Sequence, residues 1–139
     1  MEQLSVRIGP YTYGGRLEEA AAPRTCALIR SLLPIHSKVI HVRWSGEGVW
    51  IPFGENHFSL PYENPTSHPA PGQFILYPGG LSEAEILLAY GGVDFSSKVG
   101  QLAGSHFLTL TTNLETLPAL GELVLWQGAQ DILIDLGLR

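Results

Sequence analysis

Residues 39–53 read VIHVRWSGEGVWIPF, and this stretch decides the fold class and indicates where function resides. Apolar and polar residues alternate over residues 39–44, which predicts a short strand because successive side chains of a strand point to opposite faces. A second apolar run over residues 49–53 predicts its partner, and the two glycines in residues 45–48 suit the turn between them. The stretch therefore predicts a β-hairpin in the middle of the chain.

The same hairpin gathers chemically active side chains in a chain with few charges. It contains His41, Arg43 and Glu47 together with Trp44 and Trp50. Aromatic walls lower the local dielectric constant and so strengthen the polar contacts made between them. The planar guanidinium of Arg43 suits a carboxylate or an amide oxygen, and the alternative is an ion pair with Glu47 or Glu63 that fixes the hairpin.

The composition favours one domain over residues 1–139 with many short elements. Sixteen Gly and ten Pro interrupt the chain of 139 residues often, which is typical of a β-sandwich or β-barrel and not of a helical bundle. The net charge is −5, with eight Lys and Arg in total. We expect no nucleic-acid partner, because no basic patch is available to neutralise phosphates.

Periodicity predicts a mainly β fold with two helices that cap the sheet. We expect strands over residues 4–8, 11–19, 39–44, 49–53, 73–77, 83–90, 105–112 and 131–136, and helices over residues 23–33 and 117–127. The long segment 54–72 contains four prolines and no periodic pattern, which indicates an ordered loop with a functional role.

The remaining composition bears on compartment and partners. Residues 1–8 lack the pattern of a secretory signal, and the longest apolar run, residues 86–90, is too short to cross a bilayer. We therefore expect a cytoplasmic protein without a membrane partner. Cys26 is the single cysteine and is expected to be an inert core residue. The low charged fraction of 15% predicts cover by a second copy of the chain or by an enzyme-subunit partner.

Further candidates for a site lie outside the hairpin. Glu83 and Glu85 are two residues apart on a predicted strand, so both carboxylates would point the same way and one pKa would rise, which suits acid and base chemistry. The alternative is a solvated outer face. His41 could be an acid or base, or a hydrogen-bonded structural residue. Asn64 could close over a ligand, or satisfy the backbone of its own loop.

Neither a metal nor a cofactor is expected. The five histidines show no helix-spaced pair and no cysteine pair accompanies them. The glycine pairs lack the strand, loop and helix order of a phosphate-binding site, so we assign them to turns.

Three local sequences resemble the cyclophilins. Residues 15–17 and 22–25 are similar to the cyclophilin opening, in which a glycine-bearing strand leads into a helix that begins Pro, basic residue, Thr. Residues 104–109 resemble the Gly-Ser-Gln-Phe-Phe strand, and residues 131–137 resemble the C-terminal strand. The resemblance implies a closed cyclophilin-like β-barrel. A more specific resemblance, over residues 20–110, is to a family of small bacterial proteins of unknown function with that fold.

The resemblance does not carry prolyl isomerase activity with it. Arg43 lies near the position of the cyclophilin arginine that polarises a prolyl peptide, but the surrounding Phe-His-Arg and Pro-Gly-Phe sequences are missing. His106 replaces a glutamine, and Leu108 replaces an aromatic residue that contacts proline. We expect peptide isomerisation near background.

These observations lead to three hypotheses of function. In the first, a groove walled by Trp44, Trp50 and Tyr77 binds a small amide, imide or carboxylate. Arg43 would hold its oxygen, Glu47, Glu83 or Glu85 would accept its N–H, and Asn64 and His106 would add further contacts. The second hypothesis is an enzyme, or an enzyme subunit, that acts on cyclic amides or imides by glutamate acid and base chemistry. The third is an interaction module without chemistry of its own.

Overall fold

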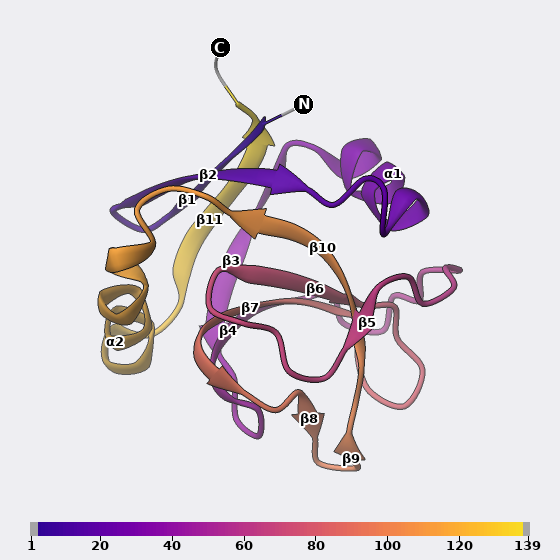
Figure 1. The fold of residues 1–139 in the computed structure, drawn as a ribbon. Coiled ribbons are helices and arrows are strands. Elements are labelled where there is room, and N and C mark those ends of the chain that lie inside the picture. The colour runs from indigo at the N-terminus through magenta and orange to yellow at the C-terminus, as the bar shows by residue number, and fades with distance from the viewer. Residues whose placement is uncertain (1–2, 138–139) are drawn as a thin grey trace.

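The chain folds into a closed antiparallel β-barrel with two helices (Figure 1). The computed structural model describes residues 3–137. Its elements, in chain order, are β1 (Gln3–Ile8), β2 (Tyr11–Leu17), α1 (Pro23–Leu32), β3 (Ile35–His41), β4 (Gly46–Pro52), β5 (Pro65–Thr66), β6 (Gln73–Tyr77), β7 (Glu85–Val93), β8 (Ser96–Ser97), β9 (Gly100–Gln101), β10 (Gly104–Leu110), a 3₁₀ turn (Leu114–Thr116), α2 (Leu117–Gln127) and β11 (Gln130–Leu136).

Eight strands close the barrel, in the order β2, β1, β11, β3, β4, β7, β6 and β10. The first and last strands pair with each other, Leu108 opposite Leu17 and Leu110 opposite Gly15, so the main sheet has no open edge there. The two helices lie on opposite sides of the barrel (Figure 1). The prediction of a mainly β, closed barrel with two helices is confirmed.

Two apolar clusters lie on opposite faces of the sheet. Side chains such as Ile86 and Leu88 of β7 belong to the main core, together with the buried residues of both helices. Leu87, between them, faces the other way and packs in a second cluster, which we call the outer cluster and which includes Tyr77 and Phe95. Because residues 93–102 cover this outer face, β7 is buried on both sides and its sequence is continuously apolar instead of alternating.

The start of α1 is held by a side chain from the long loop. The Glu63 carboxylate accepts hydrogen bonds from the Thr25 N–H (2.8 Å), the Thr25 hydroxyl (2.9 Å) and the Arg24 N–H (3.2 Å). Partial desolvation raises the pKa of Glu63, but these three hydrogen bonds outweigh it, and the pKa is lowered. Glu63 therefore fills the role of a helix N-cap, since the N-cap residue Ala22 has no side-chain acceptor.

Glu63→Ala should lower the midpoint of thermal unfolding by a few degrees, because two backbone N–H groups at the start of α1 lose their acceptor. Glu55→Ala, on the same loop and exposed, is the matched control and should leave the midpoint unchanged. Equal midpoints for both variants would contradict the capping role. Calorimetry of the two variants measures the difference.

Several predicted strand boundaries are wrong, among them the start of β4 at Gly46 and the end of β7 at Val93, and two others bear on the site. The strand expected over residues 39–44 ends at His41, and the strand expected to begin at Glu83 begins at Glu85. The first strand ends early because the chain turns at Ser45 toward residues 93–102, and the Ser45 carbonyl accepts the N–H of Asp94 (2.9 Å). His41 and Arg43 therefore do not share a strand face, and Glu83 lies in a loop.

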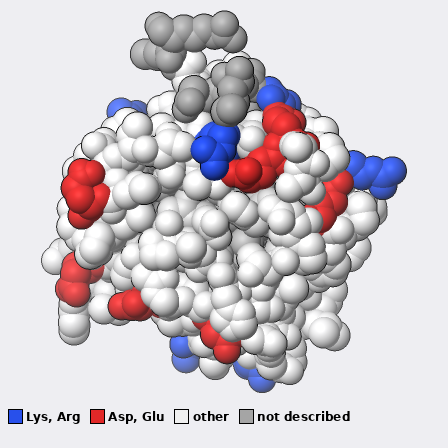
Figure 2. All heavy atoms as spheres, in the orientation of Figure 1, with Lys and Arg blue, Asp and Glu red and all other residues white. Residues whose placement is uncertain are grey.

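Charge is sparse on the face shown in Figure 2, where acidic and basic side chains lie near the edges and leave a broad uncharged centre. Among the helices of residues 3–137, none is long and apolar enough to span a membrane.

Candidate functional site

A pocket opens on the outer face of the barrel. It lies between the β3–β4 loop, β4, the start of β7 and residues 93–102, which we call the covering segment. We call the pocket itself the outer-face pocket. Its volume is about 260 Å³, and its lining consists of Val42, Arg43, Trp44, Ser45, Trp50, Ser82, Glu83, Glu85, Ser96 and Ser97. The lining therefore combines two indole rings, charges of both signs and four hydroxyls, which is the mixture typical of a small-molecule site.

Strand pairing places one aromatic wall. Trp50 on β4 lies opposite Leu87 on β7, and both side chains belong to the outer cluster. Trp44 forms the rim and is 54% exposed, with the Arg43 guanidinium carbon 5.2 Å from the centre of its ring. A guanidinium at this distance over an indole makes a cation–π contact, which holds Arg43 at the mouth of the pocket.

The opposite rim is fixed by one buried serine. The Ser45 hydroxyl accepts a hydrogen bond from the Ser96 N–H (3.0 Å) and donates one to the Ser96 carbonyl (3.1 Å). Ser45 is 5% exposed, so this pair of bonds is shielded from water. It ties the β3–β4 loop to the segment that carries Ser96 and Ser97.

Glu85 lies at the base of the pocket and is the most unusual residue of the site. Its side chain points to the outer face, like Leu87 two residues further along β7, and the residue is only 8% exposed. Burial, followed by the charge of nearby Glu83, raises the pKa of Glu85 to about 8. Within residues 3–137 no hydrogen bond or ion pair involves its carboxyl group. At neutral pH the group is therefore protonated, buried and without a protein partner.

Tyr77 lies beneath the pocket and does not form its wall. The side chain is 2% exposed, and its ring meets Phe95 edge to face, 5.9 Å between centres. Its hydroxyl accepts the N–H groups of Leu81 (3.0 Å) and Ser82 (3.3 Å). Tyr77 therefore positions the loop that carries Glu83, although the sequence predicted a direct contact with ligand.

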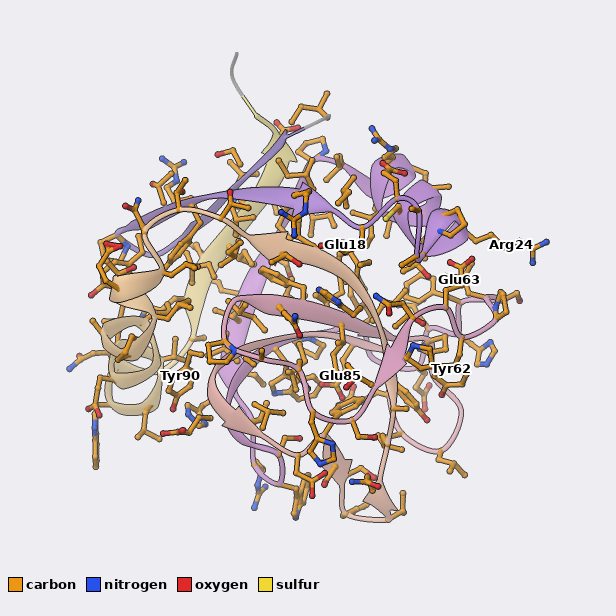
Figure 3. The ribbon with its side chains drawn as sticks, in the orientation of Figure 1. Glu18, Arg24, Tyr62, Glu63, Glu85 and Tyr90 are labelled. Carbon is orange, nitrogen blue, oxygen red and sulfur yellow. The ribbon has the colours of Figure 1, made fainter. Side chains whose placement is uncertain are left out.

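Glu47 and His41 lie outside the pocket lining. The Glu47 carboxylate accepts the Gly92 N–H (2.8 Å), which fastens the start of β4 to the end of β7. His41 Nδ1 lies 2.9 Å from the Val42 carbonyl and Nε2 lies 2.7 Å from the Tyr90 hydroxyl. Because a carbonyl only accepts, Nδ1 carries the hydrogen and Nε2 accepts from Tyr90. Tyr90 lies beside α2, away from Glu85 (Figure 3).

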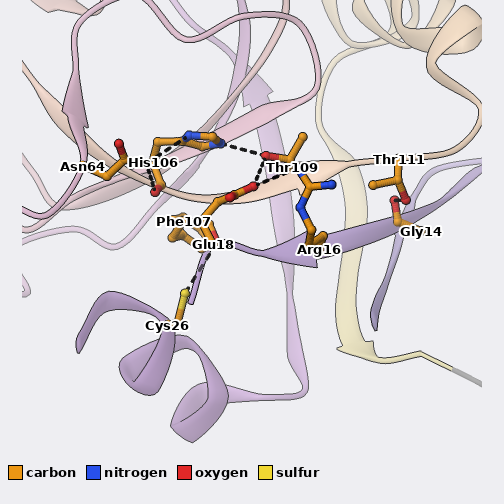
Figure 4. Close-up of polar contacts among 9 residues, drawn as sticks. All are labelled: Gly14, Arg16, Glu18, Cys26, Asn64, His106, Phe107, Thr109 and Thr111. Carbon is orange, nitrogen blue, oxygen red and sulfur yellow. Dashed lines mark hydrogen bonds and ion pairs between the residues drawn. The ribbon is translucent and has the colours of Figure 1, made fainter. Parts of the chain in front are cut away.

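Asn64 and His106 belong to a separate polar chain (Figure 4). Asn64 Nδ2 lies 3.3 Å from His106 Nδ1, and His106 Nε2 lies 2.9 Å from the Thr109 hydroxyl. That hydroxyl donates to Glu18 (2.6 Å), so His106 Nε2 must be the donor to it. Arg16 also donates to Glu18 (3.2 Å). The chain joins β2, β10 and the long loop at a place where none of its members lines the outer-face pocket.

This polar chain sets the charge states of its members. Burial lowers the pKa of His106, although Glu18 acts in the opposite direction, so the imidazole is neutral at pH 7. Burial also opposes the ionisation of Glu18, but the bonds from Thr109 and Arg16 lower its pKa. No sequence pattern points to Glu18 or Thr109 as members of a polar chain, because only the pairing of β10 with β2 brings them together.

The structure thus brings together Arg43, Trp44, Trp50, Glu83 and Glu85, and it places the other predicted residues elsewhere. The serines of the lining come from three separate segments and share no sequence pattern. A second, more open hollow of about 450 Å³, lined in part by Glu55, His57 and Leu81, shares Ser82 and Glu83 with the pocket.

A protein-family model matches residues 4–135, nearly all of the described chain. The chain belongs to the family described as "Protein of unknown function (DUF3830)". This agrees with the resemblance to a family of unknown function noted in the sequence. Among curated proteins, none matches this chain.

Two solved structures share the fold. One is described as the structure of McbB in complex with tryptophan, with a TM-score of 0.73 and 15% identity, covering 96% of this chain and 44% of that one. The other is the solution structure of the hypothetical protein AF2241 from Archaeoglobus fulgidus, with a TM-score of 0.64 and 16% identity, covering 98% and 95%. The chain therefore spans less than half of the McbB chain. At these identities the likeness establishes the fold alone.

Proposed function

We propose that the outer-face pocket binds a small amide, imide or carboxylate ligand. The observation that carries the proposal is Glu85, a buried carboxyl group that faces a pocket and has no partner among the described residues. Leaving a buried polar group unsatisfied costs free energy, and a ligand that bonds to Glu85 recovers it. Two indole rings beside the carboxyl supply apolar contact area for the rest of the ligand.

Each charged residue has a distinct task in this proposal. The neutral Glu85 acid donates a hydrogen bond to a ligand oxygen, the ionised Glu83 accepts a ligand N–H, and Arg43 holds a second oxygen. The tryptophan complex of the structural neighbour McbB supports a ligand of amino-acid size as a starting point. The likeness to cyclophilins stays a prediction about the fold and does not bear on the proposed ligand contacts.

A thermal-shift screen of small amides, imides and carboxylates tests the proposal. A compound at ten times its Kd should raise the unfolding midpoint by roughly 4–7 °C, because it binds only the folded state. Arg43→Ala and Glu83→Gln should remove most of this shift. Arg24→Ala is the matched control, since Arg24 is exposed on α1 and does not line the pocket.

The screen has two outcomes that contradict the proposal. In the first, no compound of the screen shifts the unfolding midpoint at millimolar concentration. In the second, a compound shifts the midpoint equally in wild type, Arg43→Ala and Glu83→Gln.

A second candidate function is catalysis on a cyclic amide or imide, as an enzyme or enzyme subunit. It is favoured by the pairing of a carboxyl that is neutral at pH 7 with an exposed carboxylate in one pocket, because such a pair provides an acid and a base. Turnover of a bound compound should then fall sharply in Glu83→Gln while the variant still binds. Loss of binding and turnover together would favour the binding role.

A further inference from the structure

Charged groups of both signs line the outer-face pocket without neutralising one another. Arg43, Glu83 and Glu85 all belong to the lining. The ion pairs found within residues 3–137 do not join Arg43 to either glutamate, and the guanidinium lies over the Trp44 ring instead. A molecule with charges of both signs could pair with each group separately.

The two glutamates of the pocket favour a positively charged ligand group over a neutral one. Glu85 lies at the base of the pocket and Glu83 lies in the adjoining loop, so a positive group between them would meet two carboxyls. An ammonium group provides three N–H donors and a charge, whereas an amide N–H provides a weaker neutral contact. The indole ring of Trp50 beside them also favours a cation.

We propose that the outer-face pocket selects a compound that carries both an ammonium and a carboxylate group, as a free amino acid does. The ammonium contacts Glu85 and Glu83, and the carboxylate pairs with Arg43 at the rim. This inference rests on the proposed function and narrows the ligand class to a zwitterion. For such a ligand, the ionised Glu85 carboxylate accepts from the ammonium, in place of the hydrogen bond that the neutral acid would donate to the oxygen of an amide or imide.

The size of the pocket agrees with one such molecule. Its volume of about 260 Å³ corresponds to roughly eight water molecules in the liquid, which leaves room for a single compound of amino-acid size. Trp44 and Trp50 lie where an apolar or aromatic side chain of the ligand would pack. We therefore expect aromatic amino acids to bind better than small polar ones.

Binding of an ammonium should release a proton from Glu85. The titratable groups around it are Glu83 and Arg43 in the lining, Tyr77 opposite it across the β6–β7 pairing, and Lys98 in a third hollow, which shares Trp44, Ser82, Glu83 and Ser97 with the pocket. None of these is a close, fixed cation for Glu85, so the ligand would supply the charge that favours the carboxylate. At pH 7 close to one proton should be released for each molecule bound.

Titration calorimetry with four related probes tests the inference. The probes are phenylalanine, phenylalaninamide, N-acetylphenylalanine and N-acetylphenylalaninamide, which share one side chain and lack the charge at neither end, one end or both ends; the acetyl group also adds size at the amino end. Phenylalanine should bind at least tenfold more tightly than each blocked form. Repeating the titration in two buffers of different ionisation enthalpy measures the released proton.

Variants identify which residue meets which charge. Arg43→Met should weaken binding of phenylalanine to the level of phenylalaninamide and leave phenylalaninamide unaffected. Glu85→Gln should abolish proton release. Arg24→Met is the matched control and should behave as wild type.

The outcomes separate this inference from the proposed function. If N-acetylphenylalaninamide or a cyclic imide binds as tightly as phenylalanine or more tightly, the zwitterion inference fails and the proposed function stands. If all four probes and every amide, imide and carboxylate of the screen fail to bind, both fail. Binding of phenylalanine that is unchanged in Arg43→Met would also overturn the inference.

Discussion

Replacing Glu85 by glutamine should stabilise the protein at neutral pH, by ~3 kcal/mol at pH 7 and ~5 kcal/mol at pH 9. Most substitutions of buried residues destabilise, so the expected sign is unusual. The reason is that the folded wild type must either keep a proton on Glu85 or bury a charge without a partner. Glutamine has a similar shape and never ionises.

The stabilisation should depend on pH in a defined window. The pKa of Glu85 is raised from 4.5 to about 8 on folding, so the folded state holds more protons than the unfolded state between these values. Wild-type stability is therefore fully present below pH 4.5, falls as pH rises through this window, and levels off above about pH 8. The two proteins should be nearly equal in stability at pH 4.

Urea unfolding of wild type and Glu85→Gln at pH 4, 7 and 9 measures this difference. Glu83→Gln is the matched control. Glu83 is exposed, and its charge is the smaller cause of the raised pKa of Glu85, so its replacement should stabilise the protein much less than Glu85→Gln does. A Glu85→Gln variant that is equally or less stable than wild type at all three pH values would show that the carboxyl is solvated or paired.

Trp50→Ala should lower the free energy of unfolding by about 2–4 kcal/mol and also remove one wall of the pocket. Trp50 is half-buried and packs on the outer cluster that contains Leu87 and Phe95. Truncation to alanine removes this contact area and leaves a space that the strands β4 and β7 cannot close. Ligand-induced thermal shifts should disappear in the same variant.

Trp126→Ala provides the control for the loss of a tryptophan. Trp126 on α2 is 73% exposed, and its indole N–H donates to Glu122 on the same helix. Its truncation should change the free energy of unfolding by no more than about 0.5 kcal/mol. Denaturant unfolding that shows equal losses for the two variants would mean that the outer cluster contributes no packing energy.

Most of the fold could be predicted from residue patterns, because each barrel strand has a buried face and an outward one. The helix over residues 117–127 and the closing strand illustrate this, since their apolar spacing alone locates them. The ends of the strands were harder to predict. The end of β3 at His41 is set by bonds between Ser45 and residues 94–96, which no local pattern announces.

The candidate site was predictable only in part for the same reason. Arg43, Trp44 and Trp50 are near in sequence, and β7 brings Glu85 beside β4 through pairing of Pro52 with Glu85. The expectation that Glu83 and Glu85 share a strand face was wrong, because Glu83 precedes the strand, although both line the pocket. One pKa of the two was expected to rise, and that of Glu85 does, but the larger cause is burial beneath residues 93–102, which a pair of nearby glutamates does not predict.

The charge state of Glu85 can be measured directly by following the carboxyl ¹³C chemical shifts of the glutamates as a function of pH. A buried, unpartnered Glu85 predicts one carboxyl that titrates near pH 8 and that is absent from the spectrum of Glu85→Gln. If every glutamate of the wild type titrates below pH 5, Glu85 is solvated or paired, and the outer-face pocket loses the feature on which its proposed function depends.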